Sequence, residues 1–130
     1  MTGIKHDAGK LRWDLLPKDV EIEIHWLQKY RWHEIEELEV LIDLEKWAEV
    51  ACCLLQNELC TWEQIVEVFT KGAEKYGDNN WQQLKNPKAR CYSALRRHNR
   101  AGINEKDFNI VHYAHMAVNA IFLRWFEKYK

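Results

Sequence analysis

Long apolar runs are absent from this chain of 130 residues. No apolar run approaches the roughly 18 residues that a membrane-spanning helix needs. The first ten residues, MTGIKHDAGK, contain no hydrophobic signal region. We therefore expect a soluble, cytoplasmic protein with no membrane partner.

Cysteine pairs with metal or disulfide spacing are also lacking. The four cysteines are Cys52, Cys53, Cys60 and Cys91, and no two of them form a Cys-x-x-Cys pair. Adjacent cysteines do not easily bridge each other, and a zinc site needs better ligand spacing. We expect buried, reduced thiols that pack as small hydrophobic groups.

An excess of charge of either sign is the third absence. The chain has 19 basic and 20 acidic residues, for a net charge of -1. This balance argues against strong non-specific binding to duplex nucleic acid, although it permits a local basic patch. A hydrophobic fraction of 47% and a charged fraction of 30% are typical of a folded protein. The length predicts a single domain over residues 1–130.

Helix breakers are few, since the chain has two prolines and five glycines. Apolar residues recur at helical spacing, which predicts helices over about 17–30, 33–58, 62–76, 88–100 and 108–128. Thr61 and Gln64 form a capping-box pattern, and Gly77 and Gly102 are expected to end helices. The predicted fold class is all-α, a compact bundle of four to five helices.

Histidines on the last predicted helix are the first candidate site. His112, His115 and Asn119 are separated by three and four residues, which places them on one helical face. Two imidazoles at this spacing suit a metal ion or a phosphate contact. The alternative is a pair of half-buried histidines that make hydrogen bonds in the core.

The only dense basic cluster lies on the preceding helix, around His98. Arg90 and Arg97 are two turns apart there, and arginine forks match phosphate oxygens. A solvated basic face is the alternative. Near the N-terminus, Gly9 permits a tight turn that presents Lys10 to an anion.

Tryptophan is abundant, with seven residues in the chain. Trp81 follows a turn beside Asn80, and it either stacks on a nucleobase or plugs the end of the bundle. A self-association surface would explain some of the others, and we expect a homo-oligomer. The residues considered for that surface are Trp26, Trp32, Trp47 and Trp62.

Read together, these segments resemble a phage and prophage family of dATP/dGTP diphosphohydrolases. The resemblance rests on four blocks in the family's order, within residues 5–17 and 62–122. They are Lys5–Pro17 with its Asp-Leu-Leu-Pro end, Gly72–Gly77 followed by Asn80-Trp81, the pair Arg97-His98, and His112–Asn119 with the pattern His-x-x-His-Ala-x-x-Asn.

The resemblance implies hydrolysis of a purine nucleoside triphosphate to the monophosphate and pyrophosphate, with Mg²⁺ or Mn²⁺ as cofactor. It implies the host cytoplasm as the location if a phage encodes the chain. On the hypothesis of such an enzyme, we assign roles to residues of three kinds. These are the catalytic residues His98 and Asp107, the metal ligands Glu67, His112 and His115, and the nucleotide-binding residues Lys10, Lys75, Asn80, Trp81, Arg90, Arg97 and Asn119.

Two departures from the family pattern leave alternatives open. Residues 18–60 look like an insertion relative to short members, and the family's Asp-x-Glu-Ser-Gly stretch is replaced by residues 105–109. One alternative is a non-catalytic phage-type protein that sequesters a nucleotide or a cyclic nucleotide signal and so counters host defence. Another is a structural oligomer built on the tryptophan-rich segment.

Overall fold

All the regular secondary structure in the described part of the chain is helical, which confirms the all-α prediction. The computed structural model describes residues 10–104 and 110–130, and no strand occurs among them. The α-helices are α1 (Lys18–Tyr30), α2 (Leu38–Asp43), α3 (Trp47–Gln56), α4 (Trp62–Tyr76), α5 (Pro87–Asn104) and α6 (Ile110–Tyr129). Short 3-10 helices are η1 (Trp13–Leu15), η2 (Ile35–Glu37) and η3 (Asn80–Gln83).

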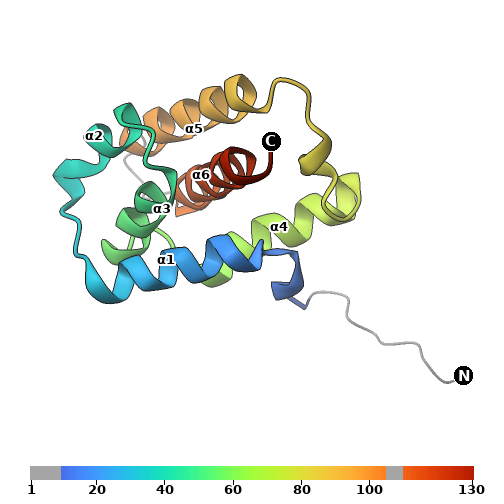
Figure 1. Cartoon of the computed structure of the whole chain (residues 1–130), viewed down its shortest axis with the longest axis horizontal. Coiled ribbons are helices and arrows are strands. Elements are labelled where there is room, and N and C mark those ends of the chain that lie inside the picture. Colours follow the sequence, from blue (N-terminus) through green and yellow to red (C-terminus); the bar gives the residue numbers. More distant parts are fainter. Residues whose placement is uncertain (1–9, 105–109) are drawn as a thin grey trace, which may run out of the picture.

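Helix α6 runs through the middle of the bundle. It contacts α5, α3, α4 and α1, and these helices surround it in Figure 1. A helix enclosed in this way must be apolar on most of its circumference. Its buried side chains are Ala114, Met116, Ala117, Val118, Ala120, Ile121, Leu123 and Phe126.

The two ends of α4 follow the local sequence signals closely. Thr61 accepts a hydrogen bond from the Gln64 backbone at 3.2 Å, and the Gln64 side chain accepts one from the Thr61 N–H at 2.9 Å. This is the predicted capping box. Gly77 ends α4 with a φ of 95°, a conformation that glycine adopts without steric cost.

The single helix predicted over 33–58 was wrong, because the chain turns at Glu45. Lys46 donates its N–H to the Leu41 carbonyl at 3.0 Å, and Glu45 donates to Ile42 at 3.0 Å. These are the two bonds of a Schellman cap, and Glu45 takes the left-handed conformation usually reserved for glycine. The described chain therefore has six α-helices rather than four to five.

Gly102 does not end its helix, contrary to the prediction, because α5 continues to Asn104. A Cβ atom at position 102 would lie 2.9 Å from the ring of Tyr113. Glycine therefore lets α5 and α6 approach closely at this level.

Residues 18–60 form part of the main hydrophobic core. Val20 and Ile24 of α1, Ile42 of α2 and Trp47 of α3 are buried in the same cluster as α6. All four cysteines are free and buried, as predicted, and burial raises the pKa of Cys60 to about 12. None of the described helices combines the length and the apolar character that crossing a membrane would require.

Candidate functional site

Three histidines from two helices meet between α5 and α6, and we call them the imidazole cluster: His98, His112 and His115. The Nδ1 atoms of His98 and His112 lie 3.1 Å apart, so one ring nitrogen must carry a proton and the other must accept it. The rings of His98 and His115 are stacked with centroids 4.8 Å apart. The cluster thus joins the Arg97-His98 block to the His112–Asn119 block.

Burial lowers the pKa of two of the three rings, His98 and His115. Burial is the largest cause that lowers the pKa of His98 to about 4, and His115, His112 and Arg97 add to it through their charges. Burial, His112 and Lys71 lower the pKa of His115. His98 is therefore unprotonated at neutral pH, and its neutral ring has one nitrogen lone pair that can accept a proton.

The depressed pKa of His98 predicts a loss of stability in mild acid. His98 takes up a proton near pH 6.5 when unfolded but only near pH 4 when folded. Between these values the unfolded state binds more protons, so stability falls as the pH falls. We expect a loss of about 1–2 kcal/mol, which is less than the full shift because solvent screens this half-buried ring. Chemical denaturation at pH 7 and pH 4.5 measures it.

Comparison with His98→Gln isolates the contribution of this one ring. The variant keeps a polar side chain and has no group that titrates in this range. Its stability should depend less on pH between 4.5 and 7 than that of the wild type. An equal pH dependence in both proteins would contradict the buried, neutral assignment of His98.

Helix α4 lies beside the imidazole cluster and contributes a cation that sequence reasoning missed. Lys71 is close enough to His115 to lower its pKa. Glu67, a predicted metal ligand, is bound to Lys71 at 2.9 Å, with half of its side chain exposed. Asn119 donates to the backbone carbonyl of His115 at 2.9 Å. In the sequence, only the i to i+4 spacing of Glu67 and Lys71 could have drawn attention to Lys71.

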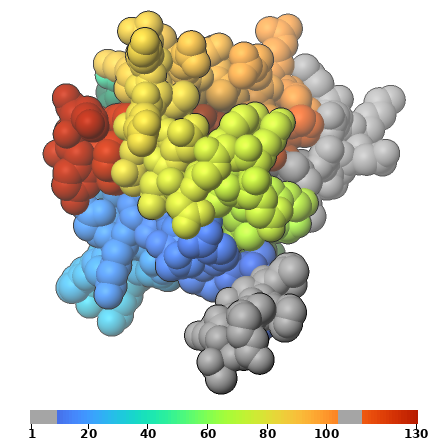
Figure 2. Space-filling model, turned by 90° about the vertical axis from the view of Figure 1, so that its right-hand side faces the viewer, coloured from blue at the N-terminus to red at the C-terminus, as the bar shows by residue number. Residues whose placement is uncertain are grey.

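The N-terminal block is tied to the end of α4 through Arg12. Its guanidinium donates to both carboxylate oxygens of Asp78, at 2.7 and 2.9 Å, and to Asp14 at 2.8 Å. Its backbone N–H donates to Thr70 Oγ1 at 3.0 Å. Figure 2 shows the blue start of the described chain against the yellow-green end of α4. Lys10 is exposed at this end.

The family-like blocks therefore meet in two pairs. The N-terminal block meets the block that follows α4, and the Arg97-His98 block meets the His112–Asn119 block. Two adjacent residues of α4 interact with these two pairs of blocks. Thr70 accepts a hydrogen bond from the Arg12 backbone, and the charge of Lys71 lowers the pKa of His115. Helix α4 thus connects two groups of residues that are far apart in the sequence.

Trp81 packs against the core. Its ring stacks on Phe122 with centroids 4.4 Å apart, and it makes edge contacts with Phe69, Trp125 and Phe126. Of the two interpretations of this residue, the packing favours the plug at the bundle end. Phe122 follows His115 and Asn119 along one strip of α6, so the aromatic group and the imidazole cluster are neighbours on that helix.

The remaining predicted residues are spread over the surface. Lys75 and Asn80 are exposed at the end of α4 and in η3, and Arg90 is exposed near the start of α5. Arg90 is about 12 Å along the helix from His98. Asp107 lies outside the described residues. Within residues 10–104 and 110–130, no three His, Cys, Asp or Glu side chains are grouped so that they could hold a metal ion.

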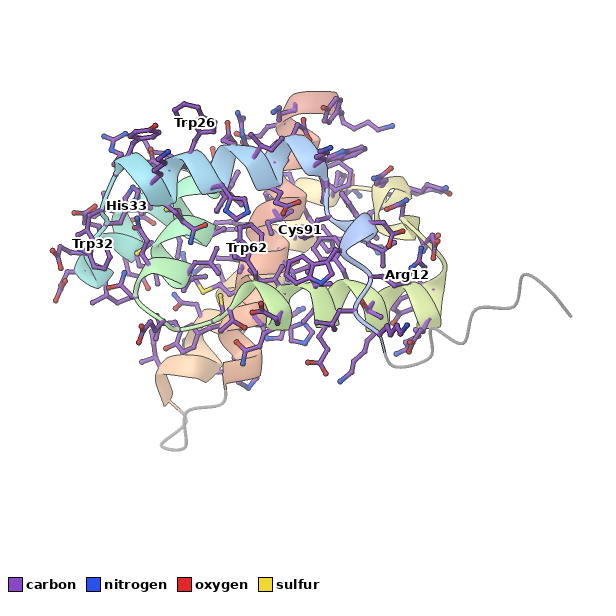
Figure 3. The ribbon with its side chains drawn as sticks, turned by 90° about the horizontal axis from the view of Figure 1, so that it is seen from below. Arg12, Trp26, Trp32, His33, Trp62 and Cys91 are labelled. Carbon is purple, nitrogen blue, oxygen red and sulfur yellow. The ribbon has the colours of Figure 1, made fainter. Side chains whose placement is uncertain are left out.

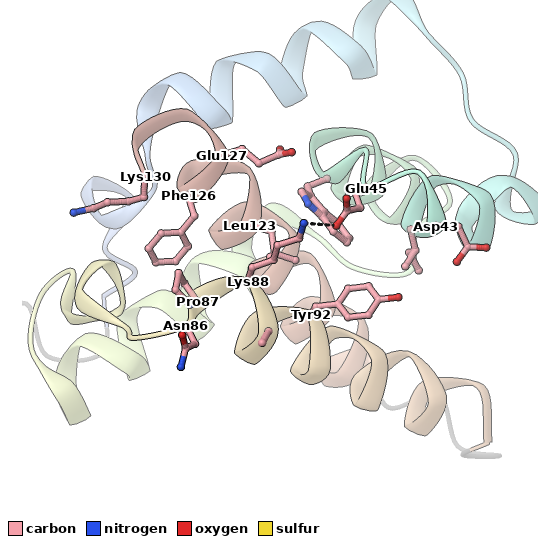
Figure 4. Close-up of a pocket in the computed structure, with 13 residues that line it drawn as sticks. Asp43, Glu45, Asn86, Pro87, Lys88, Tyr92, Leu123, Phe126, Glu127 and Lys130 are labelled. Carbon is pink, nitrogen blue, oxygen red and sulfur yellow. Dashed lines mark ion pairs between the residues drawn. The ribbon is translucent and has the colours of Figure 1, made fainter.

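A large cavity of about 1040 Å³ lies toward the other end of α6. It is bounded by the start of α5 and the end of α2, where Lys88 and Glu45 form an ion pair at 3.1 Å (Figure 4). Tyr92, Leu123 and Phe126 supply apolar walls. No residue predicted from the sequence to bind nucleotide or metal lines this cavity.

The tryptophans considered for self-association divide into exposed and buried residues. Trp26 and Trp32 are 61% and 60% exposed and project outward in Figure 3. Trp47 is buried in the core, and Trp62 packs against the core and stacks on His25. Trp26 also stacks on exposed Tyr30, so the outer face of α1 carries an aromatic patch.

Comparison with known protein families identifies the family to which this helical bundle belongs. A family model described as dATP/dGTP diphosphohydrolase, N-terminal, matches residues 54–130. The match spans more than half of the chain, so the chain belongs to this family. It includes α4, α5 and α6 and leaves out most of residues 18–60. No curated protein and no solved structure matches significantly.

Proposed function

We propose that this protein hydrolyses a purine deoxynucleoside triphosphate to the monophosphate and pyrophosphate. The family name supports a nucleotide hydrolase at a coarse level. The imidazole cluster carries the finer proposal, because two family-like blocks bring three imidazole rings into contact beside Arg97. Hydrolysis joins a water oxygen to the α-phosphorus and breaks its bond to the oxygen that bridges to the β-phosphate.

The side chains around the cluster suit this reaction. His98 is unprotonated at neutral pH, so we propose that it accepts the proton of the attacking water, together with Asp107. Arg97 and Lys71 flank the imidazoles with positive charge, which would hold the phosphates. Lys10, Lys75 and Asn80 would contact the rest of the nucleotide from the end of α4.

A divalent ion is part of the proposal. His112 and His115 would be its ligands, and Glu67 would join them only by leaving its ion pair with Lys71. Imidazole nitrogen suits transition ions better than Mg²⁺, which prefers oxygen. Of the two ions we therefore favour Mn²⁺. When bound, such an ion would polarise the phosphate chain and lower the pKa of water.

The test is incubation of the purified protein with a panel of nucleoside triphosphates, with and without Mg²⁺ or Mn²⁺. Release of pyrophosphate from dATP or dGTP, faster with Mn²⁺, is the expected result. Recovery of every nucleotide intact, in all conditions, would contradict the enzymatic proposal.

The second candidate function is sequestration of a nucleotide or cyclic nucleotide signal without chemistry. The observation that favours it is the lack of a grouped metal site among the described residues, beside a helix rich in arginine. Intact nucleotide that stays on the protein through gel filtration, with no pyrophosphate released, would support this candidate over the enzyme.

Arg97 is expected to matter for the substrate more than a distant surface cation. A charge-assisted bond to phosphate contributes roughly 1.5–3 kcal/mol, so Arg97→Ala should raise KM at least about tenfold. Lys85→Ala removes one exposed positive charge outside the cluster, and its KM should stay within about twofold of the wild type. Equal small effects at both positions would mean that Arg97 is only surface charge.

We also propose that the protein self-associates through the aromatic patch of α1. Ile22, Trp26 and Tyr30 are spaced four residues apart on one face, and each is about half exposed or more. Trp26→Glu places a charge in this face and should shift a dimer or larger oligomer to monomer by light scattering at micromolar concentration. A monomeric wild type under these conditions would contradict the proposal.

A further inference from the structure

A hollow on the outer side of α5, away from the imidazole cluster, collects three arginines. It has a volume of about 810 Å³, which is within the range of small-molecule sites. We call it the arginine shelf. Its lining includes Glu39 of α2 and, on α5, Tyr92, Arg96, Arg97, Asn99 and Arg100. Glu39 lies outside the family match, so the shelf combines a family helix with the segment before it.

The charge of the arginine shelf is strongly positive. Arg97 and Arg100 form no ion pair with any residue in the described ranges 10–104 and 110–130. Arg96 is held against Tyr92, because it donates to the phenol oxygen at 3.0 Å and lies over the ring at 5.8 Å. Glu39 is the one carboxylate in the described lining. Three guanidinium groups beside a single carboxylate favour an anionic ligand with several oxygens.

A buried polar atom indicates what else the ligand must carry. Asn99 is only 5% exposed, and its amide nitrogen donates to Glu39 Oε1 at 2.7 Å. Its Oδ1 atom is buried and has no hydrogen-bond donor in the described part of the chain. An unsatisfied acceptor is unfavourable in a folded protein and calls for a partner. A ligand with an N–H or O–H group would satisfy it.

We propose that the arginine shelf binds a nucleoside phosphate, separately from the imidazole cluster. Its phosphates would lie on Arg96 and Arg100, while Arg97 borders both this site and the imidazole cluster, and an amino or hydroxyl group of its base or sugar would donate to Asn99 Oδ1. The exposed side chain of Ile103 adds an apolar surface for the base. This site goes beyond hydrolysis and does not require it.

The test is calorimetric titration in EDTA with dATP and with inorganic tripolyphosphate. It is made on the wild type and on the His112→Ala/His115→Ala variant, in which the shelf alone is intact. In both proteins dATP should bind, and Arg100→Gln should weaken it at least tenfold. Lys85→Gln removes the same charge elsewhere and should change dATP affinity less than twofold. Binding lost in the double histidine variant but kept in Arg100→Gln would overturn the shelf and leave the hydrolytic site supported.

Asn99→Leu tests the acceptor itself. Leucine has the same branched arrangement of side-chain heavy atoms and no polar atom, so we expect the melting temperature to stay the same or rise. The affinity for dATP should fall at least tenfold, toward that of tripolyphosphate, which has no base or sugar. Equal affinities of the wild type for the two ligands would overturn the proposal, because the shelf would then only attract polyanions. A lower melting temperature with unchanged dATP affinity would also overturn it, since Asn99 would then only join α5 to α2.

Discussion

Replacing His112 and His115 together by alanine is expected to abolish metal-dependent turnover, with a fall in rate of at least about a hundredfold. Both rings belong to the imidazole cluster, and the substitution leaves His98 with no imidazole partner from α6. Pyrophosphate release from dATP and dGTP, with Mn²⁺ and with Mg²⁺, measures the effect.

The double variant should remain folded, because the buried residues that fasten α6 are its apolar ones. Met116, Val118 and Ile121 are almost fully buried, whereas His112 and His115 are only partly so. Far-ultraviolet circular dichroism and a thermal melt check the fold. His25→Ala, which changes an exposed histidine of α1, is the control and should keep full activity. Wild-type rates in a folded double variant would refute the metal assignment.

Replacing Trp81 by alanine should have the largest effect on stability. The ring stacks on Phe122 and makes edge contacts with Phe69, Trp125 and Phe126, so its removal leaves a cavity between η3 and the core. Replacing a packed tryptophan by alanine lowers the free energy of unfolding by about 3–5 kcal/mol. Urea denaturation measures the change in the free energy of unfolding.

Trp32→Ala is the matched control, since it removes the same side chain from a position that is 60% exposed and lies outside the aromatic patch of α1. The free energy of unfolding of this control should stay within about 0.5 kcal/mol of the wild-type value. The pair also separates the two interpretations of Trp81. If Trp81 mainly stacked on a nucleobase, its alanine variant would keep its stability and lose nucleotide affinity, which would contradict the packing role.

Local signals succeeded where a short stretch of chain determines the conformation. Thr61 and Gln64 satisfy each other within one helical turn, and Gly77 supplies the residue with positive φ that follows. The start of α4 and its end were therefore predictable. The division of residues 33–58 was not, because Glu45 and Glu58 occupy left-handed positions where glycine is the usual signal. Burial of Trp47 at the start of α3 accompanies the first of these turns.

The candidate site was predictable in its residues and unpredictable in its grouping. The spacing of His112 and His115 places them on one face of a helix, whatever surrounds it. Their contact with His98 depends on how closely α5 and α6 pack, which Gly102 permits. Lys71 escaped notice because nothing in the sequence says that α4 faces His115.

The sequence by itself determined the helical class, the capped ends of α4, the buried thiols and the residue types available for phosphate chemistry. These depend on composition and on contacts between residues three or four apart. Only the tertiary structure decided that Arg12 binds Asp78, that three imidazoles meet, and that Asn99 is buried against Glu39. Such contacts join residues 14 to 66 positions apart. They arise from the packing of helices around α6, which no local pattern encodes.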